Sequence, residues 1–158
     1  MIKITIPGHQ KEELCLQHLI LDFNGTLAIE GKLISGVTEK LLSLSKKITI
    51  HVLTGNTYGT AAEELKDLPC KLISVGERNQ QAEKENYLNT IDHETVISIG
   101  NGRNDKLMLL KSAIGIVVMQ AEGMSVDAFM AADIVCHNIF DALDLLENPN
   151  RIKSTLRN

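Results

Sequence analysis

Short apolar runs alternate with segments of helical spacing along most of this sequence, and this alternation limits the folds that are open to it. The runs are HLILDF (18–23), ITIHVLT (48–54), KLISV (71–75), TVISIG (95–100), AIGIVVM (113–119) and DIVC (133–136). Continuous apolar runs of this length are typical of parallel strands that are covered on both faces. The segments between them, such as GVTEKLLSLSKK (36–47) and NDKLMLLKSA (104–113), place apolar residues at helical spacing. The alternation predicts an α/β protein with a doubly wound, Rossmann-like parallel sheet.

Length and charge narrow the class of protein further. At 158 residues, the chain is expected to form a single domain over residues 1–158. Within it, residues 1–18 are expected to add a strand or hairpin, and residues 149–158 to form a loosely held tail. The net charge is −4 without a basic block, which disfavours nucleic-acid binding. No apolar segment is long enough for a signal peptide or a membrane span, so we expect a cytoplasmic protein that does not bind membranes.

A small β-hairpin is expected at residues 27–34, where a Glu-Gly pair is flanked by short apolar stretches. It follows the apolar run 18–23, so it would project from the carboxyl end of that strand. The turns TGNTYG (54–59) and GNGRND (100–105) each follow another strand and lead into a helix. Because ligands of doubly wound sheets bind outside the carboxyl ends of the strands, we expect these three segments to line one site.

Asp22 follows three apolar residues at the end of a strand, where a substrate can reach its carboxylate. Gly25 permits a tight turn after it, and Thr26 offers a hydroxyl and a backbone N–H group to an anion. The alternative is that Asp22 caps a helix or stabilises a turn. The glycine and the threonine that follow favour a functional site.

Thr54 and Lys84 are further candidates for binding a phosphate group. Thr54 ends a strand and is followed by Gly55, so a hydroxyl and free N–H groups are predicted at a helix N-terminus. An N-cap is the simpler interpretation of a threonine alone. Lys84 lies on a predicted helix, where a solvated lysine is the ordinary case. A functional role for Lys84 therefore depends on the other site residues.

The loop IGNGRND supplies Asn101, Asn104 and Asp105 at one turn, with Gly102 as a hinge. These side chains offer the oxygen ligands that a hard cation such as Mg²⁺ prefers. Taken alone, the loop would be interpreted mainly as a turn and a helix cap.

The order of an aspartate, a threonine, a lysine and a glycine-rich Asn/Asp loop resembles the haloacid dehalogenase-like (HAD) phosphohydrolase superfamily. DFNGT (22–26) is similar to its D-x-D-G-T motif and GNGRND to its G-D-G-x-N-D metal loop, while Thr54 and Lys84 match its second and third motifs. VLTGNT, GRND and GIVVMQAEGMSVDAFMAADIV further resemble the phosphorylation domain of P-type ATPases and its small stand-alone relatives. The resemblance implies a HAD-like fold, without a cap domain because no insertion is large enough for one.

The resemblance also implies a Mg²⁺-dependent phosphohydrolase, in which Asp22 attacks a phosphoryl group and forms an aspartyl-phosphate that water hydrolyses. The implied catalytic residues are Asp22, Asn24, Thr54 and Lys84. The implied Mg²⁺ ligands are Asp22, the Asn24 backbone carbonyl, Asn101 and Asp105. The implied phosphate-binding residues are Asp22, Asn24, Gly25, Thr54, Gly55, Lys84 and Asn104.

Two positions that are usually acidic in the wider family carry amides here, Asn24 and Asn101, and both precede glycine. The acid at the first position would normally protonate the leaving oxygen and then activate water, which contributes about 10²- to 10⁴-fold. An amide has no proton to give at neutral pH. We therefore expect slow turnover of alkyl phosphates, and an aspartyl-phosphate that persists as in P-type ATPases, which also lack this acid. The amide at position 101 is expected to weaken Mg²⁺ binding.

The same two amides suggest an alternative, a non-catalytic module that binds phosphate or a phosphorylated ligand. A nucleotide-binding domain ranks last, because the sequence lacks both G-x-G-x-x-G after the run 18–23 and a P-loop. The phosphorylated substrate is expected to be small or macromolecular: an uncapped site either accepts a bulky substrate or is closed by a neighbouring copy of the chain. The apolar hairpin 27–34 is expected to form that homo-oligomeric contact, as in the similar uncapped deoxyoctulosonate-phosphate phosphatases.

Overall fold

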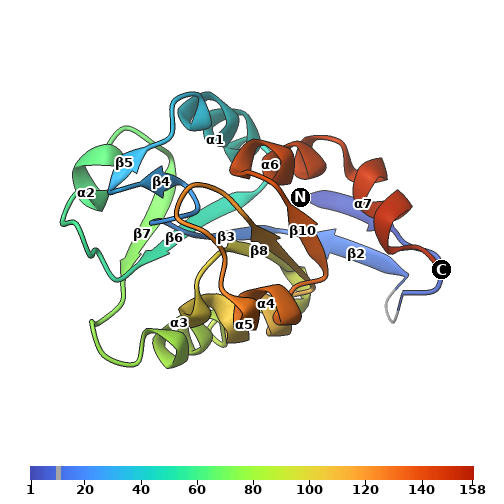
Figure 1. The fold of residues 1–158 in the computed structure, drawn as a ribbon. Coiled ribbons are helices and arrows are strands. Elements are labelled where there is room, and N and C mark those ends of the chain that lie inside the picture. Colours follow the sequence, from blue (N-terminus) through green and yellow to red (C-terminus); the bar gives the residue numbers. More distant parts are fainter. Residues whose placement is uncertain (10–11) are drawn as a thin grey trace.

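The computed structural model describes residues 1–9 and 12–158, and a six-stranded sheet lies at its centre (Figure 1). In their order across the sheet, the strands are β10 (Ile134–Cys136), β9 (Ile114–Val118), β8 (Val96–Gly100), β3 (His18–Asp22), β6 (Thr49–Thr54) and β7 (Cys70–Ser74). All neighbouring pairs are parallel. Every residue of β8 and β9 is buried, as expected for strands covered on both faces. The predicted doubly wound sheet is confirmed.

The strand order reverses between β3 and β8, and this reversal determines where a ligand site can form. The chain begins this sheet at β3 and adds β6 and β7 on one side, then returns to add β8, β9 and β10 on the other. The chain therefore leaves β3 and β8 toward opposite sides of the sheet, and ligands of doubly wound sheets bind at such a switch point. Asp22 ends β3, and the loop that begins with Asn101 follows β8.

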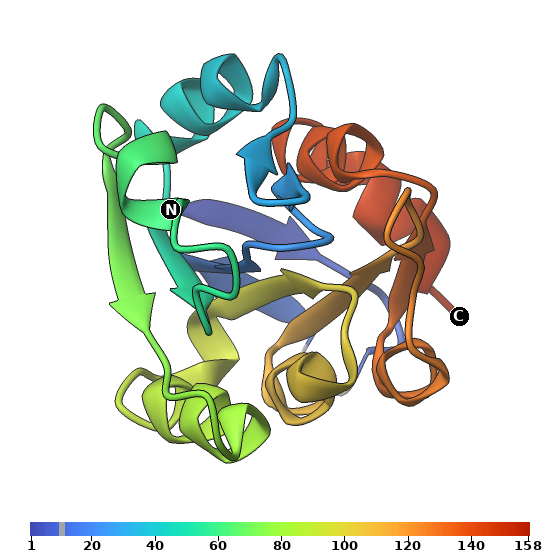
Figure 2. The same cartoon turned by 60° about the vertical axis from the view of Figure 1, so that its left-hand side comes forward.

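Helices cover both faces of the sheet (Figures 1 and 2). On one face lie α1 (Val37–Ser45), α6 (Ile139–Glu147) and α7 (Pro149–Leu156). On the other lie α3 (Gln80–Leu88), α4 (Lys106–Lys111) and α5 (Val126–Ala131). The short α2 (Ala61–Glu64) and two 3-10 turns, η1 (His93–Thr95) and η2 (Arg103–Asp105), lie in the connections. Within residues 1–9 and 12–158, no helix is long and apolar enough to cross a bilayer.

The two ends of the chain pack against each other beside the main sheet. Strands β1 (Ile2–Thr5) and β2 (Glu13–Leu16) form an antiparallel hairpin, and α7 packs against β1. Residues 10–11 of the predicted extension 1–18 lie outside the described residues. The prediction of a loose tail at 149–158 is wrong. Pro149 suits the first turn of a helix, and the completely buried Ile152 fixes that helix to the core.

The predicted hairpin at 27–34 is present as β4 (Ala28–Ile29) and β5 (Lys32–Leu33), which pair antiparallel. Leu27 and Ala28 are completely buried in the core. The half-buried apolar side chains of the hairpin are Ile29, Leu33 and Ile34. Its outer surface is therefore less apolar than the sequence indicated. Between β3 and α1 the chain contains this hairpin and no cap domain.

Candidate active site

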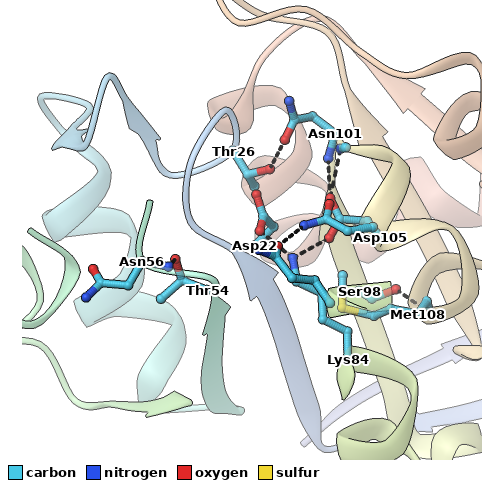
Figure 3. A network of polar contacts seen from close by, with 12 residues as sticks. Asp22, Thr26, Thr54, Asn56, Lys84, Ser98, Asn101, Asp105 and Met108 are labelled. Atoms are coloured by element: carbon cyan, nitrogen blue, oxygen red, sulfur yellow. Dashed lines mark hydrogen bonds and ion pairs between the residues drawn. The ribbon is translucent and has the colours of Figure 1, made fainter. Parts of the chain in front are cut away.

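Three charged side chains from three different elements meet at the carboxyl ends of β3 and β8 (Figure 3). The ammonium group of Lys84, on α3, lies 2.5 Å from Oδ1 of Asp22 and 2.6 Å from Oδ1 of Asp105. Lys84 and Asp105 are completely buried, and Asp22 is 6% exposed. The fold thus brings three of the predicted site residues into direct contact at the switch point of the sheet.

This cluster holds two carboxylates and one ammonium group, and burial determines its charge balance. Burial and the nearby Asp105 raise the pKa of Asp22 to about 7, although Lys84 acts in the opposite direction. Burial alone would lower the pKa of Lys84, but Asp105 and Asp22 raise it above its usual value. Lys84 therefore stays charged at neutral pH. A cation beside Asp22 would lower the Asp22 pKa and so favour its carboxylate form.

Asp105 uses both of its carboxylate oxygens inside the protein. Oδ1 accepts from Lys84, while Oδ2 accepts from the backbone N–H groups of Asn101 at 3.0 Å and Gly102 at 2.8 Å. These bonds close the loop after β8 into a tight turn and fix its position relative to Lys84.

Gly25 lets the loop after Asp22 turn tightly against Asn101. Its φ angle is +80°, which favours glycine, and a Cβ atom there would lie 2.3 Å from Nδ2 of Asn101. The Thr26 hydroxyl donates to Oδ1 of Asn101 at 3.2 Å. The Gly25 N–H group donates to the Ala28 carbonyl at 2.7 Å, so it shapes the turn. This N–H group is therefore not available for the phosphate binding that was predicted for Gly25.

Asn24 carries the acceptor oxygens of this loop that lack a partner. Its Oδ1 is buried, and no donor from residues 1–9 or 12–158 reaches either this oxygen or its backbone carbonyl. Buried acceptors are usually satisfied by protein, water or an ion. Together with the Asp22 carboxylate and Oδ1 of Asn101, these are hard oxygen donors, the kind of ligand that Mg²⁺ prefers.

The amide of Asn101 is oriented by the loops on either side of it. Its Oδ1 accepts from Thr26, and its Nδ2 donates to the Gly123 carbonyl at 3.0 Å. The Asn101 backbone carbonyl accepts from the Ser125 N–H group at 2.8 Å. A carboxylate at this position could not donate to Gly123. An amide therefore matches the surroundings of residue 101 better than the acid found at this position of the HAD motif that the sequence resembles.

Thr54 ends β6, next to β3, but no hydrogen bond or ion pair in the described part of the chain joins it to the Lys84 cluster (Figure 3). Its hydroxyl oxygen accepts from the Asn56 N–H group at 2.9 Å. The prediction that Thr54 stands at a helix N-terminus is wrong, because α2 begins only at Ala61. A turn in which Asn56 has a φ of 52° separates the strand from the helix.

Gln80, the first residue of α3, connects the loops after β6 and β8. Its side-chain oxygen accepts from Nδ2 of Asn104 at 2.7 Å, and a Cβ atom at Gly55 would lie 2.3 Å from its Nε2. Gln80 was not among the predicted site residues. Its position four residues before Lys84 was the available signal, because residues at this spacing share one face of a helix.

His51 on β6 holds the other end of α3. Its ring nitrogens lie 2.8 Å from the Tyr87 hydroxyl and 3.0 Å from a ring nitrogen of His18. Burial, with smaller contributions from His18 and Lys71, lowers the pKa of His51 to about 4. Tyr87 follows Lys84 by three residues, so this polar chain helps to hold the helix that delivers Lys84 to the site.

The loop between β9 and α5, residues 119–125, contacts three other segments around the site. It binds the loop after β3 through Gln120, the loop after β8 through Gly123 and Ser125, and the 27–34 hairpin through Glu122. In Figure 1 it is the orange segment that extends toward β4. Sequence reasoning missed these residues, although their place after a parallel strand puts them at the same edge of the sheet.

Relatives of the chain are recognisable over part of its length. No family model matches the sequence. The uncharacterized protein MJ0073 of Methanocaldococcus jannaschii is 42% identical over 78 residues, which cover 49% of this chain and 78% of MJ0073. The chain belongs to the same family as MJ0073. The uncharacterized protein MJ0072 of the same organism is 41% identical over 39 residues, which cover 25% of this chain and 89% of MJ0072.

Solved phosphatase structures share the fold of this MJ0073-family chain. One is 3-deoxy-D-manno-octulosonate 8-phosphate phosphatase from Moraxella catarrhalis, in complex with a magnesium ion, a phosphate ion and KDO; it has a TM-score of 0.69 and 15% identity, over 90% of this chain and 94% of the phosphatase. Another is the cobalt-bound deoxy-D-mannose-octulosonate 8-phosphate phosphatase from Haemophilus influenzae. It has a TM-score of 0.70 and 16% identity, over 91% of this chain and 94% of the phosphatase. The chain has the fold of HAD superfamily phosphatases, as the sequence predicted.

Proposed function

We propose that the protein is a Mg²⁺-dependent phosphohydrolase that forms an aspartyl-phosphate on Asp22. The observation that carries the proposal is the buried contact of Lys84 with both Asp22 and Asp105 at the switch point of the sheet. A turn or a helix cap needs no buried ammonium group shared by two carboxylates. Two phosphatases of the same fold support the proposal, one solved with magnesium and phosphate and the other with cobalt.

Asp22 acts as the nucleophile in this mechanism. One of its carboxylate oxygens attacks phosphorus, the bond from phosphorus to the leaving oxygen breaks, and the leaving group departs with that electron pair. Lys84 holds the attacking carboxylate in place and offsets negative charge on the phosphoryl oxygens. Water then attacks the phosphorus of the aspartyl-phosphate, which releases phosphate and restores the carboxylate of Asp22.

Oxygen atoms of the loops after β3 and β8 would hold the Mg²⁺ ion. The proposed ligands are the Asp22 carboxylate, the Asn24 backbone carbonyl and the Asn101 side-chain oxygen. Asp105 supports them from behind, because its two oxygens hold Lys84 and the turn of Asn101. When bound, the cation reduces the repulsion between the Asp22 carboxylate and an incoming phosphoryl group.

Donors from three loops would bind the phosphoryl oxygens. The Thr54 hydroxyl oxygen already accepts from Asn56, so its own proton remains available for a phosphoryl oxygen. The N–H groups of Asn24 and Gly55 have no partner among residues 1–9 and 12–158, and both suit an anion. Asn104 gives one amide proton to Gln80 and keeps the other for the ligand.

Asn24 restricts which phosphate compounds react well. Because the amide gives no proton to a leaving alkoxide, the reaction should favour leaving groups that are stable as anions, such as those of aryl and acyl phosphates. The same lack of a base should slow the attack of water. The aspartyl-phosphate should therefore persist, as the resemblance to P-type ATPases implies.

Phosphate release from acetyl phosphate, 4-nitrophenyl phosphate and an alkyl phosphate, each with Mg²⁺, tests the proposal. The acyl and aryl compounds should react faster than the alkyl phosphate, and Asp22→Asn should abolish both turnover and the phosphoryl group on the Asp22 peptide. Asp67→Asn is the matched control, because Asp67 is exposed. Asn24→Asp should raise alkyl phosphate turnover by about 10²-fold or more. Turnover that persists in Asp22→Asn would refute the nucleophile assignment.

A phosphate-binding module without catalysis is the second candidate, and the amide at Asn24 favours it. Such a module would bind phosphate or a phosphorylated ligand without releasing phosphate from any compound in the panel. We further propose that the 27–34 hairpin contacts another copy of the chain, since it lies beside an uncapped site and keeps half-buried apolar side chains.

A further inference from the structure

Gln120 lies in the 119–125 loop, and its side chain links two other segments to that loop. Its Nε2 donates to the backbone carbonyl of Gly25 at 2.9 Å and to that of Thr26 at 2.6 Å. Its Oε1 accepts from the N–H group of Ile139, at the start of α6, at 3.1 Å. One half-buried side chain thus ties the turn after Asp22 to the start of α6.

The hydrogen bonds of the turn after Asp22 show what these contacts achieve. The carbonyl of Phe23 accepts from residues later in the turn, and the carbonyls of Leu27 and Ala28 accept from Ile34 and Gly25. The side-chain NH₂ group of Gln120 donates to the two remaining carbonyls, those of Gly25 and Thr26. Within the described residues, the Asn24 carbonyl is then the only backbone carbonyl from 23 to 28 that no donor reaches.

We propose that Gln120 is a positioning residue, which fixes the peptide groups of Gly25 and Thr26 so that the Asn24 carbonyl faces the cation site. This inference rests on the proposed function, in which the Asn24 carbonyl is a Mg²⁺ ligand. Without the two bonds from Gln120, the peptide groups that carry the Gly25 and Thr26 carbonyls are held only through their N–H groups, which donate to the Phe23 carbonyl. The turn is then less rigid, and the direction of the Asn24 carbonyl within it is less firmly fixed. Among residues 1–9 and 12–158, no hydrogen bond joins Gln120 to Asp22 or Lys84, so Gln120 acts through the turn.

The variant Gln120→Glu separates this role from the contact with α6. Glutamate keeps an oxygen that accepts from Ile139 but places a second oxygen, in place of the NH₂ group, against the Gly25 and Thr26 carbonyls. Gln120→Met removes all three bonds without adding charge. Gln17→Glu is the matched control, because Gln17 is exposed and its replacement adds the same negative charge outside the site.

The first readout is backbone hydrogen exchange of residues 23–28, compared with β8. The second is a Mg²⁺ titration followed by the amide resonances of Gly25 and Gly102, which needs no catalysis. In both Gln120 variants, exchange of 23–28 should become about tenfold faster while β8 is unchanged, and Mg²⁺ should bind about tenfold more weakly, as expected for the loss of two hydrogen bonds. Gln17→Glu should behave like the wild type.

Activity gives a third readout, in which kcat should fall at fixed Mg²⁺ and recover partly as Mg²⁺ is raised. Wild-type exchange and Mg²⁺ affinity in Gln120→Glu would overturn the inference. Faster exchange throughout the sheet would also overturn it, because Gln120 would then support the fold in general. If the wild type binds Mg²⁺ but turns over no phosphate compound, the proposed function fails. Hydrogen exchange and the Mg²⁺ titration then still decide the role of Gln120.

Discussion

Replacing Asn101 with aspartate should destabilise the protein in the absence of Mg²⁺ and strengthen its response to Mg²⁺. Asn101 is 8% exposed, and its amide nitrogen donates to the Gly123 carbonyl at 3.0 Å. A carboxylate would lose this bond, face a carbonyl oxygen and add charge next to two buried carboxylates. Leaving a buried group without its partner costs about 1–3 kcal/mol. For a domain of this size, each kcal/mol lowers Tm by about 3 °C.

Thermal unfolding at increasing Mg²⁺ measures both parts of this prediction. Asn86→Asp is the control, because Asn86 is exposed on α3 and the change adds the same charge. A cation at about 100 times its Kd adds about 2.7 kcal/mol of stability, and Asn101→Asp should reach this gain at a lower Mg²⁺ concentration than the wild type. The reasoning is refuted if Asn101→Asp without Mg²⁺ is as stable as the wild type, or if both proteins need the same Mg²⁺ concentration.

Two further predictions concern pH and assembly. Because the folded pKa of His51 is about 4 and its ordinary value is 6.5, the unfolded state binds more protons below pH 6.5, and stability should fall until the pH reaches about 4. The loss in the free energy of unfolding, relative to neutral pH, should be about 2 kcal/mol at pH 5. Urea unfolding of the wild type and His51→Phe measures this loss, and an equal pH dependence in both proteins would contradict the prediction. If the 27–34 hairpin forms a contact between copies, light scattering should give a mass above that of one chain, whereas the mass of a single chain at all concentrations would count against this contact.

The apolar runs were sufficient to predict the sheet, because their length and continuity report burial on both faces. The C-terminal segment shows where this information ends. In NPNRIKSTLRN, Ile152 and Leu156 are the apolar side chains, which is too few to indicate an amphipathic helix. The helix is stabilised by packing against β1, a contact between opposite ends of the chain that local sequence does not report. The turn after Thr54 was mispredicted for a similar reason, since a helical pattern does not show where its first turn begins.

The motif residues of the candidate site were recognisable because their types and order are specific, and Asp22, Lys84 and Asp105 do meet. Gln80 and Gln120 were missed. A glutamine carries neither charge nor periodic signal, and its role depends on which carbonyl or amide faces it in the folded chain. Gln120 lies 95 positions from Gly25, so no spacing rule connects the two residues.

The two Asn-Gly pairs of the site have a consequence for chemical ageing. At such pairs the glycine nitrogen attacks the asparagine side chain, which slowly converts it to aspartate or isoaspartate. In this fold neither nitrogen is free: the Gly25 N–H group donates to the Ala28 carbonyl at 2.7 Å, and that of Gly102 donates to Asp105 at 2.8 Å. The bonds that shape the loops thus also protect Asn24 and Asn101 from deamidation, and molecules that have spent time unfolded should carry acids at these positions.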